Sequence, residues 1–175
     1  MPSSKTLGSE TIPIYVVASH IASLLSREYR VGDVYVGSTR FRRKSEIYIN
    51  CSGVRIAIEP SYSRADAERY SRAAVDSDAD AAIAVWFYSK AAAKRLSDLI
   101  FSGYYLGDVE RAGFAIKIFL KNGEENPDII LKALGIDRED IYIYRNNGWI
   151  MKANIETLAK TITILTDYLA LRRSE

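Results

Sequence analysis

The sequence predicts an α/β fold in which a central mixed β-sheet is flanked by helices, followed by a C-terminal β-hairpin and a long helix. Two observations carry this prediction. Residues 45–58 form a strand, a tight turn and a second strand, and a helical pattern follows them. Residues 81–88 (AAIAVWFY) are almost continuously apolar, which is typical of a central strand buried on both faces.

Length and composition indicate one globular domain. The chain has 175 residues, with 48% hydrophobic and 26% charged residues. We expect one domain over residues 1–175, with a core at about 12–120 and a helix-hairpin-helix extension at about 121–175. The net charge of +2 is too small to indicate nucleic-acid binding by itself, so local clusters of charge matter more.

Several classes of site and location are excluded or favoured by composition. One cysteine and one histidine rule out an intramolecular disulfide, a cysteine-based zinc site and a histidine-rich metal site. No apolar run reaches membrane-spanning length, and the first ten residues lack a signal-peptide core, so we expect a cytoplasmic protein with no membrane contact. The absence of glutamine and the abundance of Tyr, Ile, Arg and Glu are typical of a thermophile.

The N-terminal part is expected to form a helix and a short strand. Residues 12–27 repeat apolar side chains at helical spacing, and residues 34–36 (VYV) read as a strand. His20 falls within the helix. Because no second histidine and no serine or cysteine partner accompanies it, we assign it no catalytic role.

The stretch from Arg43 to Arg72 carries the hairpin. Residues 45–50 alternate as a strand, residues 51–53 form the turn, and residues 54–58 form the second strand, which Pro60 is expected to end. The hairpin brings Glu46 and Glu59 close together. Two like charges at a strand end are destabilising unless a cation lies between them, and a metal ion is one such cation.

The elements after the hairpin follow from capping and turn residues. Ser63 caps a helix at about 64–75, and the acidic residues 76–80 form a loop, since the glycine and distal glutamate of a calcium site are missing. We further expect helices, strands and a hairpin at the following places: a helix at 90–102, a strand at 113–120, a helix from Asn126 to Gly135, and hairpin strands at 141–145 and 149–153 joined by Asn-Gly.

The last helix begins after Asn154 and repeats apolar residues as a heptad seam. The seam residues are Ile155, Leu158, Ile162, Leu165 and Leu169. Packing on the chain's own sheet is the favoured interpretation. Self-association into a homodimer through this helix is the alternative.

Four cations lie in the five residues 40–44, which predicts either a solvated loop or a phosphate-contacting patch. We favour the patch because it leads directly into Glu46. The predicted contacts to nucleic acid come from Arg40, Arg42, Arg43, Lys44 and, on the following helix, Arg72.

The order of elements over residues 12–88 resembles the core of the PD-(D/E)XK nuclease superfamily, the restriction-endonuclease-like fold. Ser45-Glu46 stands in the place of the Pro-Asp pair, and Glu59-Pro60-Ser61 in the place of the Glu-x-Lys tripeptide. The alanine-rich helix with Arg69 and Arg72, followed by an apolar strand, fits the same pattern. The residues after Gly103 have no counterpart in it.

The resemblance implies a metal-dependent DNA endonuclease. Glu46, Glu59 and the carbonyl of Pro60 would hold Mg²⁺ (or Mn²⁺), which polarises the phosphate and helps to produce hydroxide. Two departures matter. Glu46 replaces an aspartate, and Ser61 replaces the motif lysine, so another cation must supply the positive charge. Lys44, Arg55 and Arg69 are candidates, and Arg69 is preferred because its helix directly follows the motif.

Three functions therefore stay open. The first is a metal-dependent endonuclease. The second is the same fold with a degraded site that binds nucleic acid without cutting it. The third is a structural or interaction subunit that uses the terminal helix and the aromatic hairpin with Tyr142, Tyr144 and Trp149.

Overall fold

The computed structural model describes residues 14–39, 44–86, 114–121, 141–143 and 149–174. In chain order the described elements are α2 (Ile14–Arg27), β1 (Asp33–Thr39), β2 (Lys44–Cys51), β3 (Val54–Ser61), α3 (Arg64–Ser77), β4 (Ala81–Trp86), β5 (Phe114–Leu120), β6 (Ile141–Ile143), β7 (Trp149–Ala153) and α7 (Ile155–Ser174). The helices predicted at 90–102 and 126–135, the hairpin turn at 146–148 and Arg40, Arg42 and Arg43 lie outside the described residues.

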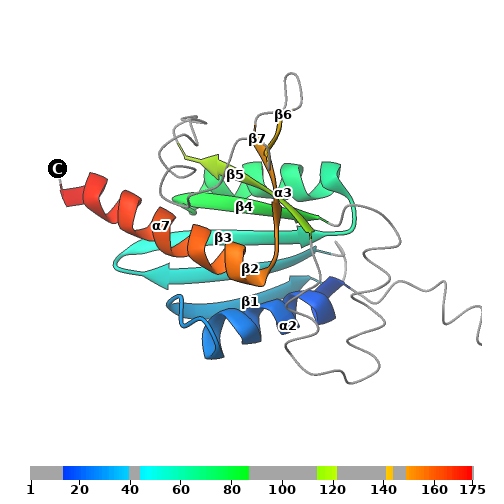
Figure 1. Cartoon of the computed structure of the whole chain (residues 1–175), viewed down its shortest axis with the longest axis horizontal. Coiled ribbons are helices and arrows are strands. Elements are labelled where there is room, and N and C mark those ends of the chain that lie inside the picture. Colours follow the sequence, from blue (N-terminus) through cyan, green and yellow to red (C-terminus); the bar gives the residue numbers. More distant parts are fainter. Residues whose placement is uncertain (1–13, 40–43, 87–113, 122–140, 144–148, 175) are drawn as a thin grey trace, which may run out of the picture.

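The strands form one seven-stranded sheet in the order β1-β2-β3-β4-β5-β7-β6 (Figure 1). β3 and β4 are parallel, and every other neighbouring pair is antiparallel. The parallel pair arises because α3 carries the chain from the end of β3 back to the start of β4. The predicted mixed α/β sheet is therefore confirmed.

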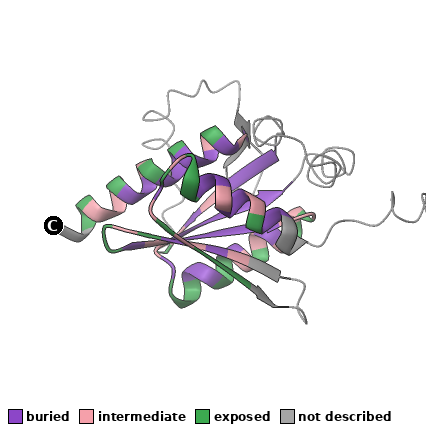
Figure 2. Ribbon diagram, turned by 90° about the horizontal axis from the view of Figure 1, so that it is seen from below, coloured by how far each residue is buried: buried purple, intermediate pink, exposed green. Residues whose placement is uncertain are grey.

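Helices cover both faces of this sheet and divide the core into two clusters. α2 and α7 pack on one face, where Ile47, Ile49, Ile56 and Ile58 alternate inward along β2 and β3. α3 covers the other face over β3, β4 and β5 with alanines, which let the helix lie close to the strands. Figure 2 shows the buried central strands between these helices.

β4 is buried along its whole length, as its apolar sequence predicts. The seam of α7 packs on the chain's own core, since Ile155, Leu158, Ile162 and Leu165 are all at most 1% exposed. The predicted cap is also confirmed, because Asn154 Oδ1 accepts a hydrogen bond from the N–H of Thr157 at 2.9 Å.

The turn between β2 and β3 is a two-residue hairpin. Ser52 and Gly53 both have positive φ, at 53° and 76°, and Cys51 pairs with Val54 on either side of them. Positive φ at both central residues is the requirement of a type I′ turn. This turn fixes the register of β2 against β3, with Ile47 opposite Ile58 as the last pair of the ladder.

The prediction that Pro60 ends the third strand was wrong. β3 continues to Ser61, and Pro60 pairs with Val85 of β4. The backbone groups of a strand point alternately to its two neighbours, and Pro60 shares the direction of Ile58, toward β2. The ladder with β2 ends at Ile58, so the missing N–H of Pro60 falls where no pairing is lost.

Within the described part of the chain, no helix combines the length and the apolar character needed to cross a membrane.

Candidate functional site

The hairpin places Glu46 and Glu59 next to the last pair of its ladder. That pair is Ile47 and Ile58, and Glu46 and Glu59 are the next residue on each strand. An antiparallel ladder continued by one residue would put the two side chains opposite each other, about 5 Å apart at Cβ. Both residues alternate with the isoleucines that face α2 and α7, so both carboxylates lie on the α3 face of the sheet.

Tyr48 lies close enough to both carboxylates for their charges to act on it. It lies two residues from Glu46 on the same strand face, and its ring packs against the cluster under α3. Burial raises the pKa of Tyr48, and so do a side-chain hydrogen bond with Glu46 and the negative charges of Glu46 and Glu59. The phenol is therefore held neutral near the two carboxylates, as a donor to Glu46.

Arg55 lies over the ring of this tyrosine. Its guanidinium carbon is 4.1 Å from the centre of the Tyr48 ring, and its Nη1 lies 3.2 Å from a carboxylate oxygen of Asp78. Arg55, a candidate for the positive charge that Ser61 lacks, therefore forms a cation–π contact with Tyr48 and an ion pair with Asp78.

The two glutamates differ in exposure. Glu59 is 0% exposed, whereas Glu46 is half-buried. Gly37 of β1 lies opposite Glu46, and a Cβ built on Gly37 would meet no atom within 4 Å. The space beside Gly37, next to Glu46, is therefore not filled by a neighbouring side chain of the described residues.

In the tripeptide Glu59-Pro60-Ser61, the Pro60 carbonyl and the Ser61 hydroxyl lie in different surroundings. The Pro60 carbonyl points toward β2 and the Glu46 side of the hairpin, by the alternation described above. The Ser61 hydroxyl oxygen accepts a hydrogen bond from the N–H of Ser63 at 3.2 Å, just before α3 begins. Ser61 thus acts in the turn that starts the helix.

The two arginines predicted on α3 lie on its outer surface. The Arg69 side chain is 68% exposed, and its Nη2 lies 2.9 Å from Oδ1 of Asp66, one turn earlier on the same helix. Arg72 is exposed, with its guanidinium carbon 5.5 Å from the centre of the Phe119 ring on β5. Neither arginine is placed beside the carboxylate pair by any described contact.

A buried lysine that belongs to none of the predicted motifs lies on the same face. Glu59 pairs with Ala84 on β4, and Ala84 pairs with Lys117 on β5, so the three residues form one row across the sheet. Two strand spacings, about 10 Å, separate the backbones of Glu59 and Lys117. Ala84 between them carries only a methyl group.

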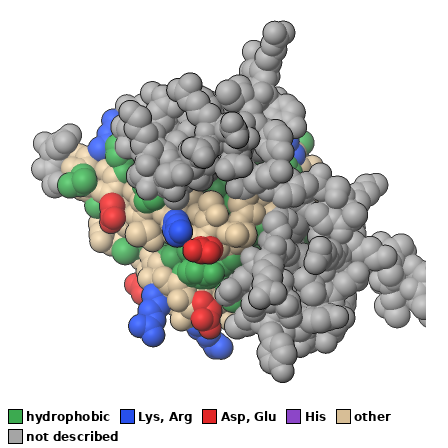
Figure 3. Space-filling model, viewed as in Figure 1, with side chains coloured by type: hydrophobic (Ala, Val, Ile, Leu, Met, Phe, Trp, Pro, Cys, Tyr) green, Lys and Arg blue, Asp and Glu red, His purple; other side chains and the backbone are tan. Residues whose placement is uncertain are grey.

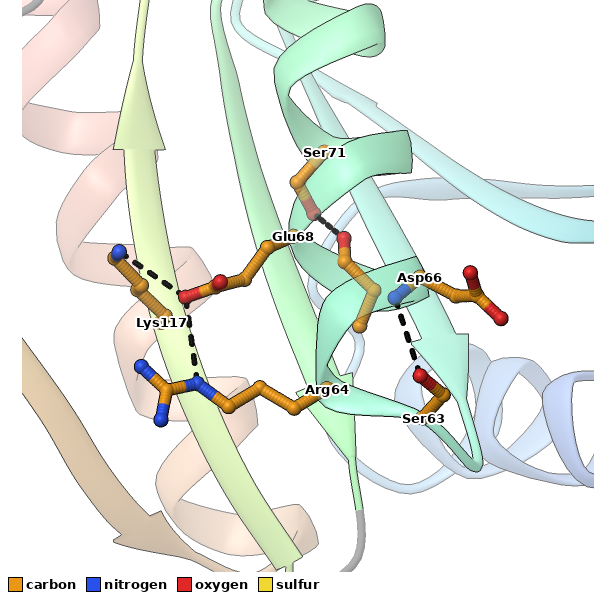
Figure 4. Close-up of polar contacts among 7 residues, drawn as sticks. Ser63, Arg64, Asp66, Glu68, Ser71 and Lys117 are labelled. Atoms are coloured by element: carbon orange, nitrogen blue, oxygen red, sulfur yellow. Dashed lines mark hydrogen bonds and ion pairs between the residues drawn. The ribbon is translucent and has the colours of Figure 1, made fainter. Parts of the chain in front are cut away.

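Lys117 is held in this position by α3. Its side chain is 3% exposed, and its Nζ lies 3.1 Å from Oε1 of Glu68, which also lies 3.6 Å from Nε of Arg64 (Figure 4). The sequence marks Lys117 only by its position, as the one charged residue in the apolar run FAIKIFL. A charge at the centre of a buried strand has to find a buried partner, but the sequence does not reveal which one.

Of the basic cluster at residues 40–44, the structure describes only Lys44. Lys44 is the first residue of β2 and pairs with Thr39 of β1, two residues before Glu46. The face of the molecule drawn in Figure 3 shows described charges of both signs scattered over it. The predicted phosphate contacts from the arginines of this cluster stay a prediction.

The donor set fits a hard divalent cation in part. Carboxylate and carbonyl oxygens are the ligands that Mg²⁺ takes in proteins, with several waters retained. Glu46 and Glu59 supply two carboxylates, and a cation between them would relieve their repulsion. Among the residues that the structure describes, no group of three or more His, Cys, Asp or Glu side chains is placed to hold a metal ion.

The comparisons with known proteins identify no relative: no family model, curated protein or solved structure matches this chain.

Proposed function

We propose that this protein is a divergent nuclease of the PD-(D/E)XK type that hydrolyses phosphodiester bonds in DNA with Mg²⁺ or Mn²⁺. The observation that carries the proposal is the pair of glutamates at the end of the β2–β3 ladder, on one face of the sheet, whose charges both act on Tyr48. The order helix, three antiparallel strands, helix and parallel strand supports the restriction-endonuclease-like core.

In this proposal Glu46, Glu59 and the Pro60 carbonyl hold the metal ion. The ion supplies Lewis-acid activation of the phosphate and of a water molecule. Tyr48 keeps the Glu46 carboxylate oriented by donating its hydroxyl hydrogen.

The positive charge that Ser61 lacks comes from Lys117. Lys117 lies in the same row as Glu59, with only the methyl group of Ala84 between them, whereas Arg69 is exposed and paired with Asp66. We therefore assign the positive charge near the carboxylates to Lys117 and no longer to Arg69. Glu68 carries one negative charge against the positive charges of Lys117 and Arg64, so this group of three keeps a net positive charge beneath α3.

A nicking assay tests the proposal. Supercoiled and branched DNA are incubated with the full chain and Mn²⁺ or Mg²⁺, beside Glu46→Gln and Glu59→Gln. We expect each substitution to reduce nicking about 100-fold or more, because it removes a ligand charge. Glu156→Gln is the matched control, since Glu156 lies exposed on α7 beyond the opposite face. Equal nicking by all four proteins would refute the assignment of the metal site.

A second function is favoured by Ser61. Because its hydroxyl serves the turn before α3, the position of the motif lysine has a structural role here. This supports a nuclease fold that binds nucleic acid without cleaving it. Salt-sensitive DNA binding that is unchanged by Glu59→Gln, together with no nicking in Mn²⁺, would decide for this function.

A further inference from the structure

The first strand of the sheet is an edge that carries exposed apolar side chains. β1 lies at one end of the strand order. Among the described residues, three large hydrophobic side chains are exposed, and two of them are neighbours in β1, Tyr35 at 55% and Val36 at 43%. Because neighbours in a strand point to opposite faces, both faces of this edge are apolar at its centre. An edge of this kind is a template for pairing with another strand.

The backbone of β1 is also oriented for pairing. In a two-residue hairpin the residues that flank the turn, Cys51 and Val54, exchange hydrogen bonds. Along β2 the backbone N–H and C=O groups point alternately to β3 and to β1, so those of Tyr48, three residues before Cys51, point toward β1. The groups of its partner Tyr35 point toward β2. The N–H and C=O groups of Val34, Val36 and Ser38 therefore point away from the sheet.

We propose that two copies of this chain pair antiparallel through β1, about a two-fold axis at Val36. Val36 is the central residue of the strand, which runs from Asp33 to Thr39. In this register each Val36 lies opposite Val36 of the second copy, and each Tyr35 lies opposite Gly37 of the second copy. The two sheets continue into one another, and the interface is closed by its symmetry.

The side chains fit this register. The space beside Gly37 is open, so it can receive an aromatic ring, and pairing of an aromatic residue with a strand glycine is a known way to cover that glycine. Asp33 is the only charged residue in the strand and lies opposite Thr39 of the second copy. Like charges therefore do not meet across the pair.

The pairing would add a residue to the candidate site. Glu46 pairs with Gly37, and Gly37 would pair with Tyr35 of the second copy, so that ring would cover Gly37 next to Glu46. This consequence rests on the proposed function, whereas the pairing itself does not. A single strand pair is smaller than the roughly 1,200 Å² of standard interfaces, so we expect a dissociation constant on the order of 10 µM.

Sedimentation velocity of the full chain from about 1 to 300 µM tests the pairing. We expect a concentration-dependent dimer that Val36→Lys weakens at least tenfold, because a lysine at an edge strand opposes pairing. Leu171→Lys is the matched control, since Leu171 is a 67% exposed apolar residue on α7. Circular dichroism checks that both variants fold.

Three results would overturn the proposal. They are a monomer over the whole range, a dimer that Val36→Lys leaves unchanged, and a dimer that Leu171→Lys dissociates, which would place the contact on α7. A monomer whose DNA binding is lost in Val36→Lys would assign the same edge to nucleic acid.

Cross-linking tests the register independently of any effect on folding. With the single native cysteine removed by Cys51→Ser, Val36→Cys places two thiols opposite each other, about 5.5 Å apart at Cα. A short bifunctional maleimide should then give a covalent dimer. Asp33→Cys in the same background should give none, because it lies opposite Thr39. Equal cross-linking of both variants, or of neither, would contradict the two-fold register.

Discussion

The ammonium group of Lys117 lies 3.1 Å from Oε1 of Glu68, and this ion pair joins the middle of β5 to the underside of α3. The Lys117 side chain is 3% exposed and that of Glu68 is 20% exposed, so the pair is largely removed from water. Removing one partner of such a pair leaves a buried charge, whereas replacing both with apolar groups does not.

We therefore expect Glu68→Ala to lower the free energy of unfolding by about 3 kcal/mol. The double variant Glu68→Leu with Lys117→Met should recover most of this loss, because no charge remains buried. Urea unfolding followed by circular dichroism measures both. The control is Glu156→Ala, whose ion pair with Lys160 on α7 joins two side chains that are at least 60% exposed. Its effect should be below about 0.5 kcal/mol, and equal effects at the two positions would count against the buried pair.

A pH titration should reveal the environment of Tyr48. Its pKa is raised above the ordinary value of 10.0, so the folded state keeps the phenol proton that the unfolded state loses. The stability that Tyr48 contributes is complete below pH 10 and falls as the pH rises above it. Absorbance of phenolate at 295 nm should show that Tyr48→Phe removes a group that ionises late in the titration. Tyr35→Phe, at an exposed position, is the control; loss of an early-ionising group in Tyr48→Phe would contradict the assignment.

The single histidine should titrate below its ordinary range. Burial lowers the pKa of His20 below 6.5, because the charged imidazolium loses water on α2. The unfolded state then binds the proton more tightly, so the contribution of His20 to stability is present above pH 6.5 and declines as the pH falls below it. Proton NMR of the one imidazole measures the pKa directly. A midpoint at or above 6.5 would show that the side chain is solvated.

Two glycines should respond oppositely to alanine. Gly32 has φ of +138°, and a Cβ there would lie 2.9 Å from both the Asn50 carbonyl oxygen and Cys51 Cβ, so Gly32→Ala should cost about 2 kcal/mol. Gly37→Ala meets no atom within 4 Å and should be neutral or slightly stabilising. Thermal unfolding at low protein concentration compares the two. A Gly37→Ala variant as unstable as Gly32→Ala would contradict the described packing of β1.

The local patterns of the sequence determined much of the fold. The alternation of residues 45–50, the turn residues Ser52 and Gly53, the cap at Asn154 and the seam of α7 each correspond to an observed element. They did so because strand alternation, turn geometry and capping depend on neighbours within a few residues. The same local rule failed at Pro60, where the end of the ladder with β2 makes a missing N–H harmless.

Tertiary structure alone decided which charges from separate elements of the sheet and helices meet. From the sequence, the hairpin was enough to bring Glu46 near Glu59, because a single turn joins the two strands that carry them. The position of Lys117 in the row of Glu59 depends on β4 and β5 pairing in one register, and its contact with Glu68 depends on α3 lying across them. Arg69, adjacent to the motif in sequence, points outward because the small residues of α3 face the sheet. Sequence distance governs turns and caps, whereas burial of apolar surface governs which side chains share the interior.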